Sequence, residues 1–154
     1  MFEARLEALG VELPGPFPPH DPLDAVVVHR GTARTSGCLP RDVEGRFPVG
    51  LLGRDLTTGD GAAAAECCAW NAVSLLRAAL GTLDGIERVL TVSVFIACVD
   101  GYAEQPQVAD GASQALVRLF GAAGRHTRSA IGVAALPRKA PVEIEVTVAL
   151  RRDG

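Results

Sequence analysis

The sequence predicts an α+β domain in which two long helices pack on one face of a mixed β-sheet. Residues 62–80 are rich in Ala and Leu and are long enough for a substantial helix. Residues 86–99 are dense in β-branched side chains, which favour a mostly buried strand. Residues 142–148 alternate apolar and polar side chains, as a strand with one buried face does.

The N-terminal segment is predicted to stand before this domain. Residues 2–9 predict a short helix, and Gly10 fits its C-terminal cap. Residues 13–22 contain five prolines and predict an extended connector, because proline fixes φ and lacks an N–H donor. We therefore expect residues 1–21 to form a helix with its connector, and residues 22–154 to form one α+β domain.

Two strands and a turn are predicted next. Residues 24–29 and 33–36 predict a hairpin around the turn Arg30-Gly31-Thr32. Residues 47–52 predict another short strand that Gly53 ends.

The long helix has a start signal and a stop signal. Thr57 and Asp60 are spaced as an N-cap residue and an acidic residue in the first turn, and Gly81 is expected to end the helix. Spacings of three and four residues predict one apolar face, made of Ala63, Cys67, Trp70, Val73 and Leu76.

The second half of the chain completes the sheet. Pro106 fits the start of a second long helix over residues 107–120. Residues 128–136 and 142–150 predict the last two strands.

Composition points to a partner subunit rather than to nucleic acid. Hydrophobic residues make up 48% of the chain and mean hydropathy is +0.23, more apolar surface than a domain of this size is expected to bury alone. Lysine occurs once, at Lys139, and the formal net charge is −3. Phosphate backbones need clustered cations, so no nucleic-acid partner is expected.

Neither a membrane nor a metal ion is expected. The N-terminal residues lack a secretory pattern and no apolar run reaches the length of a membrane span, so the cytoplasm is the expected location. The histidines are isolated and no CxxC occurs, so we expect no metal site and interpret the cysteines as buried small apolar residues: Cys38, Cys67, Cys68 and Cys98.

Arg128 and Glu143 are the candidate functional pair, because each begins an apolar predicted strand. One interpretation is an ion pair between neighbouring strand ends. The other is a site in which the Arg128 fork binds a carboxylate and Glu143 accepts a proton from water. No nucleophile–His–acid arrangement, P-loop or HExxH motif occurs, so an enzyme here would use few groups.

Several segments resemble the reactive-intermediate-deaminase (Rid) family, also called the YjgF or L-PSP family. Residues 36–40 with Gly45 are similar to its SGQxPxxxxG segment, and residues 92–95 are similar to its central strand. Residues 128–145 are similar to its signature RSxVxVxxLPxxxxxEIE. The resemblance covers roughly residues 22–150 and identifies the chain as a divergent member.

The resemblance implies a chorismate-mutase-like fold, a homotrimer with clefts between subunits, and no cofactor. It implies hydrolysis of carboxylate-bearing imines or enamines such as 2-aminoacrylate to a keto acid and ammonia. In that picture Arg128 holds the substrate carboxylate, Glu143 orients or activates water, and backbone groups near Gly37 and Ala130 line the cleft. His126 beside Arg128 is expected to tune the pocket or to be a solvent-facing loop residue.

Some family positions differ here. Leu23 stands where the deaminase branch has Tyr, Cys38 where it has Gln, Ala130 where it has Cys, and Asp110 where it has Asn. An acid at position 110 would repel an anionic substrate if it faced the cleft. The alternatives are a non-catalytic trimer that binds small carboxylates or regulates an enzyme, and the ribonuclease activity sometimes attached to the family.

Overall fold

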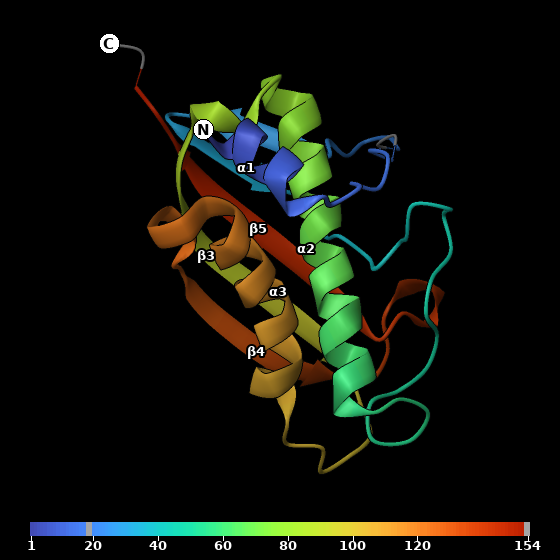
Figure 1. Ribbon diagram of the computed structural model, residues 1–154. Helices are drawn as coiled ribbons and strands as arrows, with labels where there is room; N and C mark the ends of the chain where they lie inside the picture. The colour runs from blue at the N-terminus through green and yellow to red at the C-terminus, as the bar shows by residue number, and fades with distance from the viewer. Residues whose placement is uncertain (18–19, 153–154) are drawn as a thin grey trace.

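A computed structural model describes residues 1–17 and 20–152 of the chain. It contains the helices α1 (Phe2–Leu9), α2 (Thr58–Leu80) and α3 (Gln105–Phe120). One five-stranded sheet has the order β1-β2-β5-β3-β4 (Figure 1). Its strands are β1 (Val26–His29), β2 (Thr32–Thr35), β3 (Ile86–Ala97), β4 (Thr127–Val133) and β5 (Val142–Leu150).

The sheet is mixed because two connections are helical crossovers, β2 to β3 through α2 and β3 to β4 through α3, whereas β1 to β2 and β4 to β5 reverse direction. α3 joins β3 to β4, which therefore run parallel, whereas β5 pairs antiparallel with β3 on its other side. Val92 on β3 lies opposite Arg128 on one side and Val146 on the other. β4 is thus an edge strand, and β3 separates it from β5.

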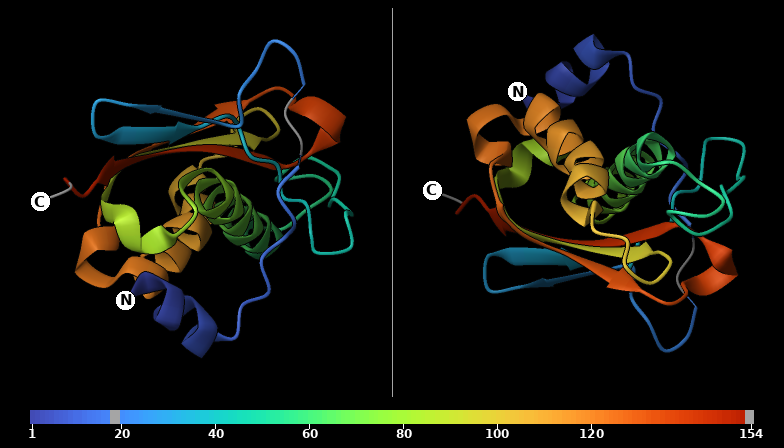
Figure 2. Two further views of the ribbon diagram at one scale, coloured as in Figure 1. Left: turned by 90° about the horizontal axis from the view of Figure 1, so that it is seen from above. Right: turned by 90° about the horizontal axis from the view of Figure 1, so that it is seen from below.

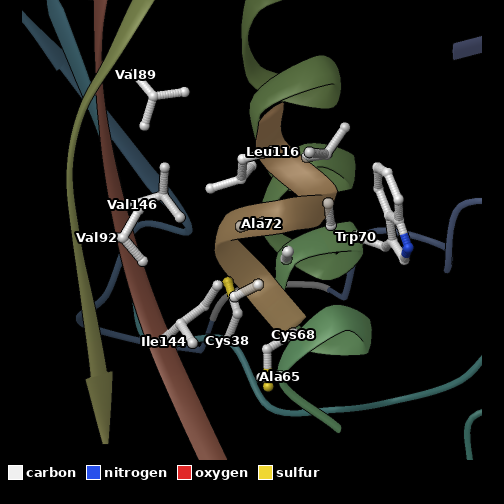
Figure 3. Packing of buried hydrophobic residues seen from close by; sticks show 14 of the residues in the cluster. Cys38, Ala65, Cys68, Trp70, Ala72, Val89, Val92, Leu116, Ile144 and Val146 are labelled. Carbon is white, nitrogen blue, oxygen red and sulfur yellow. The ribbon is translucent and has the colours of Figure 1, made fainter. Parts of the chain in front are cut away.

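Helices α2 and α3 pack on the same face of the sheet, which confirms the predicted α+β arrangement (Figures 1 and 2). Side chains that alternate along the strands fill the layer between helices and sheet, and Figure 3 shows Val92, Ile144 and Val146 facing α2 and α3. No helix among the described residues covers the opposite face. That face carries the Arg34–Glu145 ion pair, while Val27 and Ile131 are 55% and 49% exposed.

The signals predicted for the long helix are confirmed, and so is part of its predicted apolar face, since Trp70, Val73 and Leu76 are buried. Thr57 and Asp60 form a reciprocal capping box, and Gly81 adopts the left-handed conformation at the C-terminal end. Ala63 is exposed, however, and the fully buried positions include Ala65, Cys68, Ala69, Ala72 and Val73. The helix is apolar on most sides, so periodicity alone could not select the side that faces the sheet.

The strand predicted over residues 47–52 is wrong. This segment is a loop in which only Leu52 makes bridges, to Leu56 and Cys98. Pro48 lacks a donor and Gly50 has a φ of 133°, so the backbone cannot continue a ladder there. The strand predicted over residues 128–136 ends earlier, at Val133.

The N-terminal helix joins the same core. Phe2 and Leu6 are buried, and the Phe2 ring meets the Phe120 ring edge to face at 4.9 Å between centroids. Gly10 adopts the left-handed conformation expected of the cap. Residues 18–19 of the predicted connector lie outside the described residues. No helix in the described part of the chain combines the length and apolarity that a membrane crossing needs.

Candidate functional site

Arg128 projects from the edge strand β4 toward helix α3. Its Nη1 donates to Asp110 Oδ1 at 2.9 Å and to Ser113 Oγ at 3.2 Å, and its Nη2 donates to the Pro106 carbonyl at 3.4 Å. These contacts use three of the five guanidinium N–H donors. Nε and one Nη2 hydrogen have no partner among the described residues, so the fork keeps capacity for a carboxylate.

His126 extends this polar cluster. Its Nδ1 lies 2.6 Å from the Gly124 carbonyl oxygen, which can only accept, so Nδ1 carries a proton. Its Nε2 lies 2.9 Å from Ser113 Oγ. Whichever of these two atoms donates, Ser113 Oγ has a lone pair left to accept from Arg128 Nη1. His126 thereby orients Ser113, which in turn holds the guanidinium.

Asp110 partly neutralises the positive charge of Arg128, the residue predicted to bind the substrate carboxylate. The Asp110 side chain is 52% exposed whereas that of Arg128 is 22% exposed. An ion pair with one solvated partner is weak, on the order of 1 kcal/mol or less. A substrate carboxylate would therefore compete with Asp110 at small cost.

Glu143 lies on β5, on the face that no described helix covers. Its neighbours Val142 and Ile144 point into the core, so Glu143 points the other way. A Cβ at Gly37 would sit 2.1 Å from Glu143 Oε1, so the backbone of Gly37 lies directly against this carboxylate and a larger residue would displace the Glu143 side chain. Burial raises the pKa of the Glu143 carboxyl above its usual 4.5, and repulsion from Glu145 adds to the rise.

A pocket of about 510 Å³ opens beside Glu143. Gly37 and Asn71 line it together with two cationic side chains, Arg41 and Arg138. Asn71 Nδ2 donates to the carbonyl oxygens of Arg41 and Cys67 at 2.8 and 2.9 Å, which ties the loop that carries Arg41 to α2. Another pocket of about 580 Å³, near Gly50 and Leu136, contains none of the predicted site residues.

The structure does not bring Arg128 and Glu143 together within one chain. Strand β3 lies between their strands, so the two backbones are two strand spacings apart, roughly 10 Å. Arg128 faces α3 and Glu143 faces the opposite side of the sheet. The ion pair predicted between neighbouring strand ends is therefore wrong, because β4 and β5 are not neighbours.

The other predicted site residues lie in different environments. Cys38 is fully buried beside Ile144 in the core (Figure 3), where burial raises the pKa of its thiol to about 12. This burial agrees with the interpretation of Cys38 as a buried small apolar residue and leaves its side chain no exposed surface in the single chain, although the resemblance places position 38 at the substrate cleft. Leu23 is 50% exposed and does not line the pocket of Glu143. Ala130 lies two residues along β4 from Arg128, on the same face.

Sequence reasoning missed Ser113, Arg41 and Arg138. Ser113 follows Asp110 by one helical turn, so both face Arg128, and this spacing on the predicted helix was the available signal. Arg41 and Arg138 lie in loops far apart in the sequence, and no local pattern indicates that they line one pocket.

Replacing Glu143 by Gln is expected to stabilise the protein at neutral pH. The raised pKa of Glu143 means that the folded chain favours the protonated form, so stability present below about pH 4.5 is lost as pH rises through the folded-state pKa. Gln cannot ionise, so the melting temperature of Glu143→Gln should exceed that of wild type at about pH 8 and match it at about pH 4. Thermal denaturation followed by circular dichroism measures both. Glu87→Gln is the control, because Glu87 is exposed and belongs to none of the ion pairs among the described residues, so its melting temperature should match that of wild type at both pH values.

The chain matches known proteins over nearly its whole length. It is 40% identical over 148 residues to the protein TCP17 of Trypanosoma cruzi, covering 96% of this chain and 92% of that one. A crystal structure of a protein of unknown function from Agrobacterium tumefaciens is 36% identical, with a TM-score of 0.87 and coverage of 97% and 91%. A structure from Shewanella oneidensis, described as a "putative endoribonuclease", is 29% identical, with a TM-score of 0.92 and coverage of 97% and 99%.

A family model agrees with these relatives. The model described as "YjgF/chorismate_mutase-like, putative endoribonuclease" matches residues 3–145. The match includes α1, which the motif resemblance did not reach. The chain therefore belongs to the YjgF/chorismate mutase-like family, also known as the Rid family.

Proposed function

We propose that this protein is a cofactor-independent deaminase that hydrolyses small carboxylate-bearing imines or enamines to a keto acid and ammonia. The observation that carries the proposal is the Arg128 fork, oriented by Ser113 at a sheet edge and left with free donors. Membership of the Rid family and the half-buried Glu143 carboxylate support it.

The reaction requires a second subunit, and we propose a homotrimer with a cleft at each subunit boundary. Arg128 and Glu143 face opposite sides of one sheet, so only two chains can place them around one substrate. The uncovered face of the sheet supplies a surface for this packing, because Ile131 and Leu90 are 49% and 37% exposed there and Phe95 is half-buried. A symmetric assembly repeats the same contact at every boundary.

The proposed reaction needs only a few protein side chains. Arg128 binds the substrate carboxylate and fixes the imine carbon near Glu143 of the adjacent subunit. Glu143 accepts a proton as the water oxygen attacks that carbon, and a carbinolamine forms. Glu143 returns that proton to the amine nitrogen, and as the C–N bond breaks the carbinolamine hydroxyl loses its proton to the Glu143 carboxylate, which releases ammonia and leaves the keto acid. Because Glu143 must be ionised to act as the base, the rate should fall at acidic pH.

A turnover assay tests the proposal. Freshly generated 2-aminoacrylate is mixed with the pure protein, and ammonia or keto-acid release is compared with release in buffer alone. Acceleration over buffer is expected. Release at the buffer rate over the whole accessible range of protein concentration would remove the enzymatic assignment.

A non-catalytic carboxylate-binding trimer is the second candidate. The Asp110–Arg128 ion pair favours it, because Asp110 reduces the positive charge on the anchor. This candidate predicts that keto acids bind at Arg128 while imine hydrolysis stays at the buffer rate, so the same assay separates the two.

Endoribonuclease activity is the third candidate, since the family description and the Shewanella relative carry that name. The net charge of −3 and the single lysine argue against binding to a phosphate backbone. RNA cleavage by the pure protein that persists at high salt and is lost in Arg128→Ala would reverse this ranking.

A further inference from the structure

The pocket beside Glu143 contains two arginines that the proposed reaction does not use. Arg41 lies in the loop after β2, and Arg138 lies in the short turn that precedes β5. These segments lie side by side at one end of the sheet (Figures 1 and 2). Both guanidinium groups line the same pocket of about 510 Å³.

Each guanidinium lies over an aromatic ring. Arg41 Cζ lies 5.0 Å from the centre of the Phe17 ring, and Arg138 Cζ lies 5.2 Å from the centre of the Phe47 ring. A cation–π contact of this kind fixes the position of the charged group near the ring. Rings on two separate segments thus orient two cations toward one volume.

The donors of both groups remain largely free. Arg41 Nη2 donates to the Gly15 carbonyl at 3.1 Å, and no other side-chain hydrogen bond of Arg41 or Arg138 occurs among the described residues. None of the ion pairs within residues 1–17 and 20–152 includes either residue. An arginine held in this way without an acidic partner is suited to bind an external oxyanion.

The backbone that carries Arg138 is unusual. Arg138 has φ 58° and ψ 19°, and Lys139 has φ 56°, so two consecutive non-glycine residues adopt the left-handed conformation. Residues with a Cβ rarely adopt it, and it persists where surrounding contacts hold it. Here Gly50 N donates to the Lys139 carbonyl at 3.0 Å, and Arg138 lies over Phe47. These contacts hold Arg138 at the edge of the pocket in the left-handed backbone conformation, which an unrestrained loop would rarely adopt.

We infer that Arg41 and Arg138 form a second anion subsite, so that the preferred substrates or ligands carry a second oxyanion remote from the carboxylate bound by Arg128. This inference rests on the proposed function for the placement of the first carboxylate. A pocket of about 510 Å³ is within the usual range for small metabolites and exceeds the need of a three-carbon acid. Arg41 and Arg138 outnumber the one carboxylate, Glu143, so the pocket carries local positive charge although the net charge of the chain is −3.

Binding of matched stable keto acids tests the inference by calorimetry on the intact protein. 2-Oxopentanoate and 2-oxoglutarate differ in one terminal group, a methyl against a carboxylate, and 2-oxo-4-phosphonobutanoate replaces that carboxylate by a phosphonate. The terminal oxyanion should tighten binding about tenfold or more, because charge-assisted hydrogen bonds replace an apolar contact. The stronger of the two oxyanions identifies the chemical class.

The preference is the ratio of the affinity for an oxyanion ligand to the affinity for 2-oxopentanoate. The variants Arg41→Gln and Arg138→Gln should each bring this ratio toward one. Arg152→Gln removes the same charge from an exposed position near the C-terminus and should preserve it. Equal affinities for the methyl and oxyanion ligands, absence of 2-oxoglutarate binding, or a preference that survives in both variants would overturn the inference. The test needs no turnover, so a protein that fails to hydrolyse imines yet shows the preference would refute the proposed deaminase and support the subsite.

Discussion

Arg128→Ala is expected to lower kcat/KM for imine hydrolysis by about 100-fold or more, because the substrate carboxylate loses a charge-assisted hydrogen-bonded fork. The loss should appear mainly in KM if the carboxylate is held equally in the ground state and the transition state. The fold should survive, since Arg128 lies on the edge strand and its partner Asp110 is exposed. Ammonia release measured over a range of substrate concentrations gives both constants.

Two further variants separate the roles of charge and geometry. Arg128→Lys keeps the charge but loses the planar fork, so it should recover only part of the activity. Asp110→Asn removes the competing carboxylate and leaves Arg128 in place, so KM should fall. Wild-type kinetics in Arg128→Ala would contradict the assignment of the anchor, and an unchanged KM in Asp110→Asn would show that the ion pair does not compete with substrate.

Gly111→Ala is expected to destabilise the protein by about 1–3 kcal/mol, the usual cost of overpacking a close contact. Gly111 lies within α3, where alanine would normally stabilise a helix by about 1 kcal/mol. A Cβ at this position, however, would lie 1.9 Å from the Ala62 carbonyl oxygen of α2. The two helices would have to separate, and urea denaturation measures the resulting loss.

Gly59→Ala is the matched control on the other helix. Gly59 lies in the first turn of α2, and the nearest atom to an added Cβ is Thr57 Oγ1 at 3.7 Å, an ordinary contact. This variant should be neutral or slightly stabilising. If Gly111→Ala were equally stable, the close packing of α2 on α3 would not be required by the fold.

The sequence predicted those parts of the fold that local signals specify. The capping box at Thr57 and the β-branched run of β3 depend on neighbouring residues, and both are confirmed. Residues 47–52 were mispredicted because their apolar side chains suggest a strand while Pro48 and Gly50 prevent the ladder. Strand order depends on the crossover through α3, so sequence alone could not show that β3 separates β4 from β5.

The sequence names candidate site residues, but it does not show how these residues lie relative to one another. Arg128 keeps N–H donors that could bind a carboxylate. Asp110 accepts a hydrogen bond from Arg128, which an Asp at this position allows. The face on which Cys38 lies follows from its pairing with Ile144, a long-range contact with no local signature. Arg41 and Arg138 likewise share a pocket only through tertiary structure.

Mixed trimers test most directly whether Arg128 and Glu143 act across a subunit boundary. Arg128→Ala and Glu143→Gln chains with different tags are co-expressed, and assemblies that contain both are purified and assayed for imine hydrolysis. Each variant alone should be nearly inactive. If each site of the proposed trimer takes Arg128 from one chain and Glu143 from its neighbour, every mixed trimer should have one intact site, about a third of the sites in the purified assemblies. Mixed assemblies no more active than either variant alone would contradict a shared site.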